Sequence, residues 1–137
     1  MNQKIIFTND LKNKLFKIVT KLKPARILFV TANRSFVKLD IGSILEPIIS
    51  EYITARFNSF DVNPKLNDVN KGVKLLKNFR PNIIIAIGGG RVIDMSKLIG
   101  ILSQNSNYKD IIKSDLELKP SKIPLIAIPT TSGTGSE

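Results

Sequence analysis

The sequence has no cysteine and no histidine among its 137 residues. The absence of cysteine excludes disulfides, thiolate nucleophiles and metal sites with cysteine ligands. The absence of histidine removes the side chain on which most transition-metal sites and much acid–base chemistry near neutral pH depend. By itself, the chain therefore lacks the usual means of metal chemistry, and we expect no metal ligands in it.

Long apolar runs are also missing. No run approaches the roughly 18 residues that a membrane span needs, and the apolar stretches near the start are short and interrupted by lysine, unlike a signal peptide. We expect a cytoplasmic protein with no membrane partner. Hydrophobic residues make up 42% of the chain, which indicates an ordered core, and 137 residues suffice for one domain.

Acidic residues are scarce: 11 Asp and Glu stand against 21 Lys and Arg, for a formal net charge of +10. Such a balance is typical of nucleic-acid-binding proteins. However, the only dense basic patch is Lys12–Lys23, and aromatic residues are not interleaved with basic ones in a way that would stack bases. We favour a solvated basic face with a site for an anionic cofactor, and keep a basic nucleic-acid-binding domain as the weaker alternative.

Short apolar runs alternate with segments of helical periodicity, which predicts an α/β fold with a doubly wound, mainly parallel sheet. Pro47 is awkward inside its expected helix, which either starts at Glu46 or is kinked. Gln104–Ser121 is polar and reads as a surface connection with a short helix near Asp110–Lys113. The expected strands are Lys4–Thr8, Arg26–Thr31, Ala55–Phe60, Ile83–Ile87 and a run from Pro124, and the expected helices begin at Asn9 or Asp10, at Ile41, at Leu66 and after Gly90.

The stretch Asn82–Ile99 dominates this pattern: a buried-type strand runs into Gly88, Gly89 and Gly90, and a helix follows. Glycines let the backbone approach a ligand, and the helix directs free N–H groups and its positive dipole end at the turn. This arrangement predicts a phosphate site, although a turn without a ligand is the alternative. We expect Gly89 to be the least replaceable, because a Cβ there would obstruct the phosphate and could force an unfavourable dihedral.

A second loop of this kind follows the apolar run from Pro124. Its hydroxyls and glycine N–H groups can donate to anionic oxygens. Ligands of open α/β sheets bind outside the carboxyl ends of the strands, so two such loops strengthen the phosphate interpretation. The candidate residues of this loop are Thr130, Thr131, Ser132 and Thr134.

These stretches also resemble a known family. IAIGGGRVIDMSK resembles the GGGS-x-x-D-x-x-K signature of the iron-containing alcohol dehydrogenases, and AIPTTSGTGSE is similar to their second signature, usually followed by a Val-Thr that this chain lacks. Asn63-Pro64 looks like their intervening Asn-Pro element. The resemblance runs from about Ile5 to Glu137. It implies a Rossmann-like domain that binds NAD or NADP.

The resemblance also implies roles for single residues. The three glycines would donate N–H groups to the pyrophosphate, and the hydroxyl loop would contact phosphates and ribose. Arg91 replaces the usual serine and could either pair with phosphate or hinder its approach. Asp94 would face the nicotinamide or its ribose, or else only complement the helix dipole. Asn63 matches a position near the adenine, with a simple turn as the alternative.

The residues after Arg26–Thr31 bear on the choice of cofactor. An acidic side chain near the end of this strand holds the ribose hydroxyls in many dinucleotide sites, and the family commonly has an aspartate there. Here Ala32 takes that place, followed by Asn33, Arg34 and Ser35. A missing acid with a cation beside it favours a 2′-phosphate, hence NADP over NAD, unless Arg34 only points into solvent.

The implied reaction is reversible hydride transfer between a nicotinamide cofactor and a small alcohol or aldehyde, with a divalent metal, iron or zinc, polarising the substrate oxygen. In the family, an aspartate and three histidines after the second signature hold this metal. Because the chain stops at Glu137, we expect residues 1–137 to be the dinucleotide-binding domain without the helical metal-binding domain, with no catalytic residue and no activity alone. A homodimer is also implied. The alternative is a non-catalytic module that binds a nucleotide or sugar phosphate.

Overall fold

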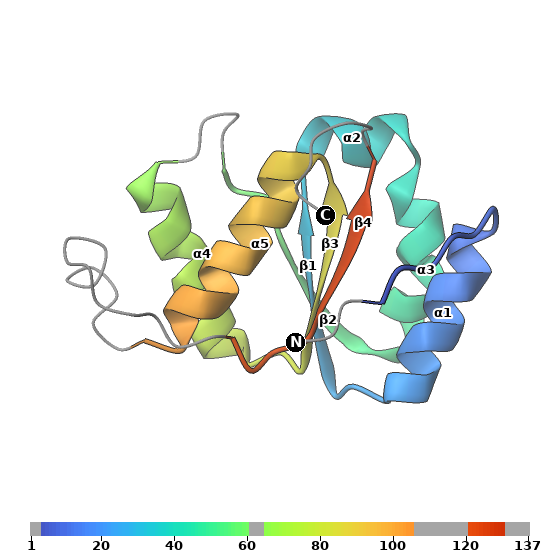
Figure 1. Ribbon diagram of the computed structural model, residues 1–137, viewed down its shortest axis with the longest axis horizontal. Coiled ribbons are helices and arrows are strands. Elements are labelled where there is room, and N and C mark those ends of the chain that lie inside the picture. The colour runs from blue at the N-terminus through green and yellow to red at the C-terminus, as the bar shows by residue number, and fades with distance from the viewer. Residues whose placement is uncertain (1–3, 61–64, 106–120, 131–137) are drawn as a thin grey trace.

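The computed structural model describes residues 4–60, 65–105 and 121–130. Within these ranges, four strands form one parallel sheet with helices on both faces (Figure 1). The predicted doubly wound α/β fold is confirmed. The strands are β1 (Arg26–Thr31), β2 (Ile53–Phe57), β3 (Ile83–Gly88) and β4 (Leu125–Pro129), and the helices are α1 (Leu11–Leu22), α2 (Asn33–Lys38), α3 (Ile41–Glu51), α4 (Leu66–Phe79) and α5 (Gly90–Ser103).

The strand order is β2-β1-β3-β4. From β1 the chain passes through α3 to β2, which pairs with one edge of β1. It then returns through α4 to β3, which pairs with the other edge of β1. In Figure 1, α1 and α3 cover one face of the sheet, and α4 and α5 cover the other. The connections therefore change face and direction between β1 and β3, and ligands of open α/β sheets bind at such a switch point.

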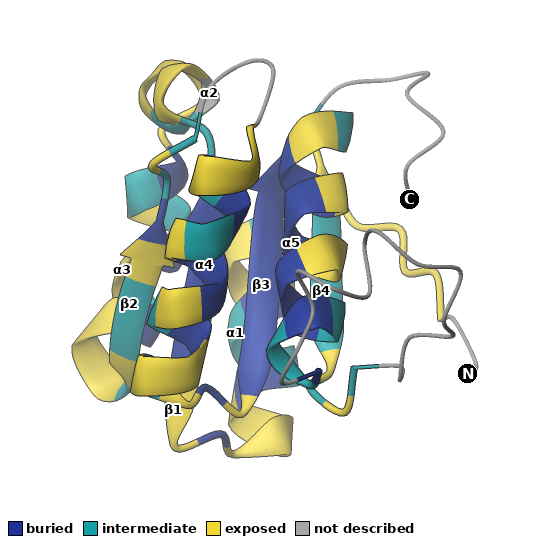
Figure 2. Cartoon of the chain, turned by 90° about the vertical axis from the view of Figure 1, so that its left-hand side faces the viewer, coloured by how far each residue is buried: buried dark blue, intermediate teal, exposed yellow. Residues whose placement is uncertain are grey.

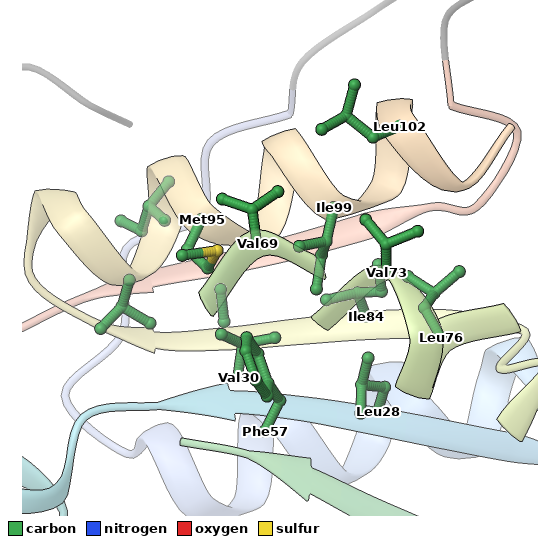
Figure 3. Packing of buried hydrophobic residues seen from close by; sticks show 13 residues of the cluster. Leu28, Val30, Phe57, Val69, Val73, Leu76, Ile84, Met95, Ile99 and Leu102 are labelled. Carbon is green, nitrogen blue, oxygen red and sulfur yellow. The ribbon is translucent and has the colours of Figure 1, made fainter. Parts of the chain in front are cut away.

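Each face of the sheet has its own apolar core. Beneath α4 and α5, side chains of both helices meet Leu28, Val30 and Ile84 of the sheet (Figure 3). All of β3 is buried, and it forms the centre of the molecule in Figure 2. This double coverage explains why the strand is a continuous apolar run rather than an alternating one.

Close packing fixes α4 against its neighbours. A Cβ added to Gly72 of α4 would lie 2.8 Å from Cγ2 of Ile99 in α5 and 2.8 Å from Cε2 of Phe57 in β2. Real Cβ atoms do not approach so closely, so only glycine fits without a shift of the helix.

Local signals set the helix ends. The Asp10 carboxylate accepts a hydrogen bond from the Asn13 N–H at 3.4 Å, so Asp10 rather than Asn9 caps α1. The last residue of α1 is Leu22. Its C-cap, Lys23, has a left-handed backbone with φ 49° and directly precedes Pro24. The end of α4 repeats this pattern, with Arg80 at φ 54° before a proline.

Several boundaries differ from the sequence prediction. The expected strand Lys4–Thr8 is wrong, because no described strand pairs with it, and Phe7 is 93% exposed. Strand β2 begins and ends earlier than Ala55–Phe60, because its ladder to β1 runs from Ile53 to Phe57. The expected short helix near residues 110–113 lies outside the described residues.

The expected start of the helix at Glu46 is wrong, because α3 runs from Ile41 with Pro47 inside it. A kink at Pro47 stays a prediction. Proline removes the N–H that would bond the carbonyl of Ser43. Ser43 is exposed, so water can reach that part of the helix. Pro47 is therefore tolerated inside α3, because water can bind the carbonyl that lacks its helical partner.

Candidate functional site

The glycine turn lies at the carboxyl end of the central strand. Gly88 ends β3, Gly89 is the N-cap of α5, and α5 starts at Gly90. A Cβ on Gly88, whose φ is +158°, would lie 2.6 Å from Cγ2 of Val92. Glycine at this position therefore allows the helix to begin directly against the strand.

The N-cap of α5 is Gly89, which has no side chain to cap the helix. Its first-turn N–H groups and the positive end of its dipole face the carboxyl edge of the sheet, an arrangement that favours an anion. The first turn carries no acidic residue that would repel one. The turn thus has the geometry that the sequence predicted for a phosphate site.

The second loop starts beside this turn. Gly88 is paired with Pro129 across the β3–β4 ladder, and the Thr130 N–H donates to the Gly88 carbonyl at 3.0 Å. Oγ1 of Thr130 is buried and has no hydrogen-bond partner in the described part of the chain. A buried hydroxyl normally has a partner, so this one is a candidate for contact with a ligand oxygen. The structure thus brings the start of the second loop, Pro129 and Thr130, beside the glycine turn.

A polar cluster lies one strand away, at the carboxyl ends of β1 and β2. Nε of Arg56 donates to Oγ1 of the buried Thr31 at 2.6 Å, and its Nη2 lies 3.5 Å from Oδ1 of Asn33. Cζ of Arg56 is 3.6 Å from the centre of the Phe36 ring. Nδ2 of Asn58 donates to Asn33 Oδ1 at 2.5 Å. This cluster joins β1, α2 and β2.

Sequence reasoning missed Arg56. It stands 25 residues after Thr31, and only the strand register, which pairs Arg56 with Phe29, brings it to the end of β1. Partial burial lowers the pKa of Arg56 through desolvation. Arginine is basic enough to stay charged at neutral pH.

The other predicted residues have different surroundings. Ala32 is half-buried after β1, and Arg34 is exposed on α2. Arg91 and Asp94 lie on the exposed side of α5, three residues apart and so on one face. Four candidates lie outside the described residues: Asn63, Thr131, Ser132 and Thr134.

The described residues do not form a metal site. The sequence has no histidine or cysteine, and the described ranges contain no group of three or more acidic, histidine or cysteine residues that could hold an ion. The same ranges contain no helix long and apolar enough to cross a membrane.

Solved structures share the fold. An iron-containing alcohol dehydrogenase from Thermotoga maritima superposes with a TM-score of 0.83 at 26% identity, over 100% of this chain and 38% of that one. A sulfoacetaldehyde reductase from Bifidobacterium kashiwanohense in complex with NAD+ superposes with a TM-score of 0.80 at 20% identity, over 100% of this chain and 38% of that one. The second likeness shows the fold alone.

Curated proteins match in sequence. Lactaldehyde reductase of Escherichia coli strain K12 is 40% identical over 78 residues, which are 55% of this chain and 20% of the relative. Aldehyde-alcohol dehydrogenase 2 of Entamoeba histolytica is 30% identical over 136 residues, 88% of this chain and 16% of the relative. The chain thus spans only 16% to 20% of the length of these relatives.

The two glycine-containing stretches resemble the signatures of one family, and a model of that family matches almost the whole sequence. The family model described as iron-containing alcohol dehydrogenase matches residues 2–137. The chain belongs to the iron-containing alcohol dehydrogenase family.

Proposed function

We propose that the chain binds a nicotinamide dinucleotide with its pyrophosphate at the Gly88–Gly90 turn. The observation that carries this proposal is the start of α5, where the N-cap is a glycine, beside the Thr130 hydroxyl, which has no partner among the described residues. Backbone N–H groups at a helix start and a buried hydroxyl together suit the oxygens of a pyrophosphate. The NAD+ bound by the sulfoacetaldehyde reductase is in keeping with this assignment.

The adenosine ribose then lies toward the end of β1, the neighbouring strand, as in other doubly wound dinucleotide sites. Asp94 is proposed to face the nicotinamide or its ribose. The hydroxyl loop is proposed to contact phosphates and ribose, and Asn63 the adenine side. The loop residues in this proposal are Thr130, Thr131, Ser132 and Thr134.

NADP(H) is the proposed preference over NAD(H). No carboxylate follows β1, because Ala32 takes that position, and two cations flank it: Arg34 on α2 and Arg56 on β2. The formal net charge of +10 favours the more anionic cofactor.

The proposed reaction of the protein that carries this domain is hydride transfer between the cofactor and a small alcohol or aldehyde. When bound, the nicotinamide would supply or accept the hydride. Iron or zinc would need ligands other than the residues of this chain. The names of the matched relatives, lactaldehyde reductase among them, support this substrate class. A cytoplasmic location and a homodimer also remain proposals.

The proposal is tested by titrating the chain with NADPH and NADH by calorimetry at low and high salt. We expect saturable binding of NADPH that weakens modestly with salt and is not displaced by duplex DNA. If neither cofactor binds, the proposal is wrong. A steep fall of affinity with salt together with displacement by DNA would favour the nucleic-acid alternative.

A further inference from the structure

Arg56 lies on the side of the sheet that faces α2 and α3. Its register partner Phe29 belongs to the apolar core of that face, and Thr31, two residues further along β1, has the same orientation. The Arg56 side chain therefore reaches diagonally toward the carboxyl end of β1. On its other edge, β1 pairs Thr31 with Ile87, the residue before Gly88. One strand, β1, thus lies between Arg56 on β2 and the glycine turn after β3, and the two inter-strand spacings add up to about 10 Å.

The guanidinium is held in place but is not neutralised by its described neighbours. One N–H donates to a hydroxyl, another points at an amide oxygen, and the plane lies over the Phe36 ring. These partners are all uncharged. Arginine has five N–H groups, so three remain for another acceptor, and an exposed, oriented guanidinium suits two oxygens of one phosphate.

Arg34 offers no comparable arrangement. It is exposed on α2, and its side chain has no hydrogen bond to a described residue. A long side chain without fixed contacts loses more conformational entropy when it binds a phosphate. The sequence pointed to Arg34 only because it follows the position of the missing acid.

We propose that Arg56 binds the 2′-phosphate of NADP(H) and determines the preference for this cofactor, with Phe36 and Thr31 as positioning residues. The inference rests on the proposed binding of a dinucleotide. The positive charge that distinguishes the two cofactors then lies on β2, outside the glycine turn and the hydroxyl loop.

The test is calorimetric titration of NADPH and NADH into the parent chain and the variants Arg56→Met and Arg34→Ala. Arg56→Met loses a charge-assisted pair of hydrogen bonds, so its affinity for NADPH should fall roughly 10- to 100-fold. Its affinity for NADH should change less than about twofold. Arg34→Ala should weaken NADPH binding less than Arg56→Met does, because Arg34 is exposed on α2. Circular dichroism and thermal unfolding check that each variant is folded.

Two conservative variants keep the test valid if Arg56→Met does not fold. Arg56→Lys keeps the charge but loses the planar fork, and Phe36→Leu keeps an apolar support but loses the ring face. Each should reduce NADPH affinity in part and spare NADH. A parallel loss of both affinities would mean that Arg56 only anchors α2 to the sheet, and that result would overturn the inference.

The remaining outcomes separate the inference from the proposed function. If the parent binds both cofactors and Arg34→Ala, rather than Arg56→Met, loses the preference, the inference is overturned and the dinucleotide site stands. If the parent binds neither cofactor, the proposed function fails and the inference fails with it.

Discussion

At the scale of single residues, the adjacent glycines of the turn have different constraints. Gly88 has φ +158° and lies too close to Val92 to accept a Cβ. Gly89 has φ −80° and ψ −172°, which any residue can adopt. The expected unfavourable dihedral at Gly89 is therefore wrong, and that constraint lies at Gly88. What remains at Gly89 is the proposed approach of a phosphate.

We predict that Gly89→Val abolishes NADPH binding and leaves the fold intact, because its side chain would stand where the phosphate approaches. Gly88→Ala should instead lower the free energy of unfolding by about 1–3 kcal/mol through overpacking. Calorimetry and urea unfolding measure the two effects. A folded Gly89→Val chain that binds like the parent would reduce the glycine run to a turn.

The unpartnered hydroxyl of Thr130 leads to a second prediction. Thr130→Val keeps the shape and removes a buried group without a described partner, so stability should stay equal or rise by up to about 1–3 kcal/mol. NADPH affinity should fall at the same time, because the hydroxyl is lost to the cofactor. If affinity is unchanged while stability rises, Thr130 has no role in binding.

At the scale of elements, a glycine in α4, Gly72, can be compared with a glycine in α3, Gly42, as its control. Gly72→Ala should destabilise the chain by about 1–3 kcal/mol, since its Cβ would meet Ile99 and Phe57 at 2.8 Å. Gly42→Ala should be neutral or stabilising by up to about 1 kcal/mol. The added Cβ would lie 3.7 Å from Cε1 of Phe36, an ordinary contact, and alanine favours a helix. Chemical unfolding of both variants compares them, and equal effects would contradict the packing at α4.

Elements with a strong internal period could be predicted from the sequence. In α4, apolar residues recur at helical spacing at Leu66, Val69, Val73 and Leu76, and the last three are buried in the structure. The apolar run of β3 and the following glycines likewise predicted the central strand and the start of α5. In these elements one pattern within a dozen residues decides the structure.

Features that depend on distant partners were beyond the sequence. Lys4–Thr8 has strand-like residues but no described neighbouring strand, and composition cannot supply one. Helix α2 is only six residues long, too short to show a period. Arg56 meets Thr31 and Phe36 only through the register of β1 and β2. The candidate site was therefore predicted where it follows a local motif and missed where strand pairing builds it.

At the scale of the whole molecule, the absence of histidine and cysteine leads to a further prediction. The purified 137-residue chain should not oxidise small alcohols or reduce aldehydes when Fe²⁺ or Zn²⁺ is added, because it lacks the usual ligands. Absorbance of the reduced cofactor follows the reaction, and NADPH binding by the same preparation is the control for folding. Turnover that rises with added metal would contradict this expectation.

The strand order also governs how the sheet can assemble. With β2 and β3 on opposite edges of β1 and β4 beyond β3, each later strand joins a free edge, and none has to insert between two paired strands. During synthesis from the N terminus, the edge of β1 stays open until β3 emerges, and the edge of β3 stays open until β4 does. Because β3 is apolar throughout, its open edge is a template for pairing with other chains. The nascent chain therefore exposes this edge of β3 between the synthesis of Gly88 and that of Pro129.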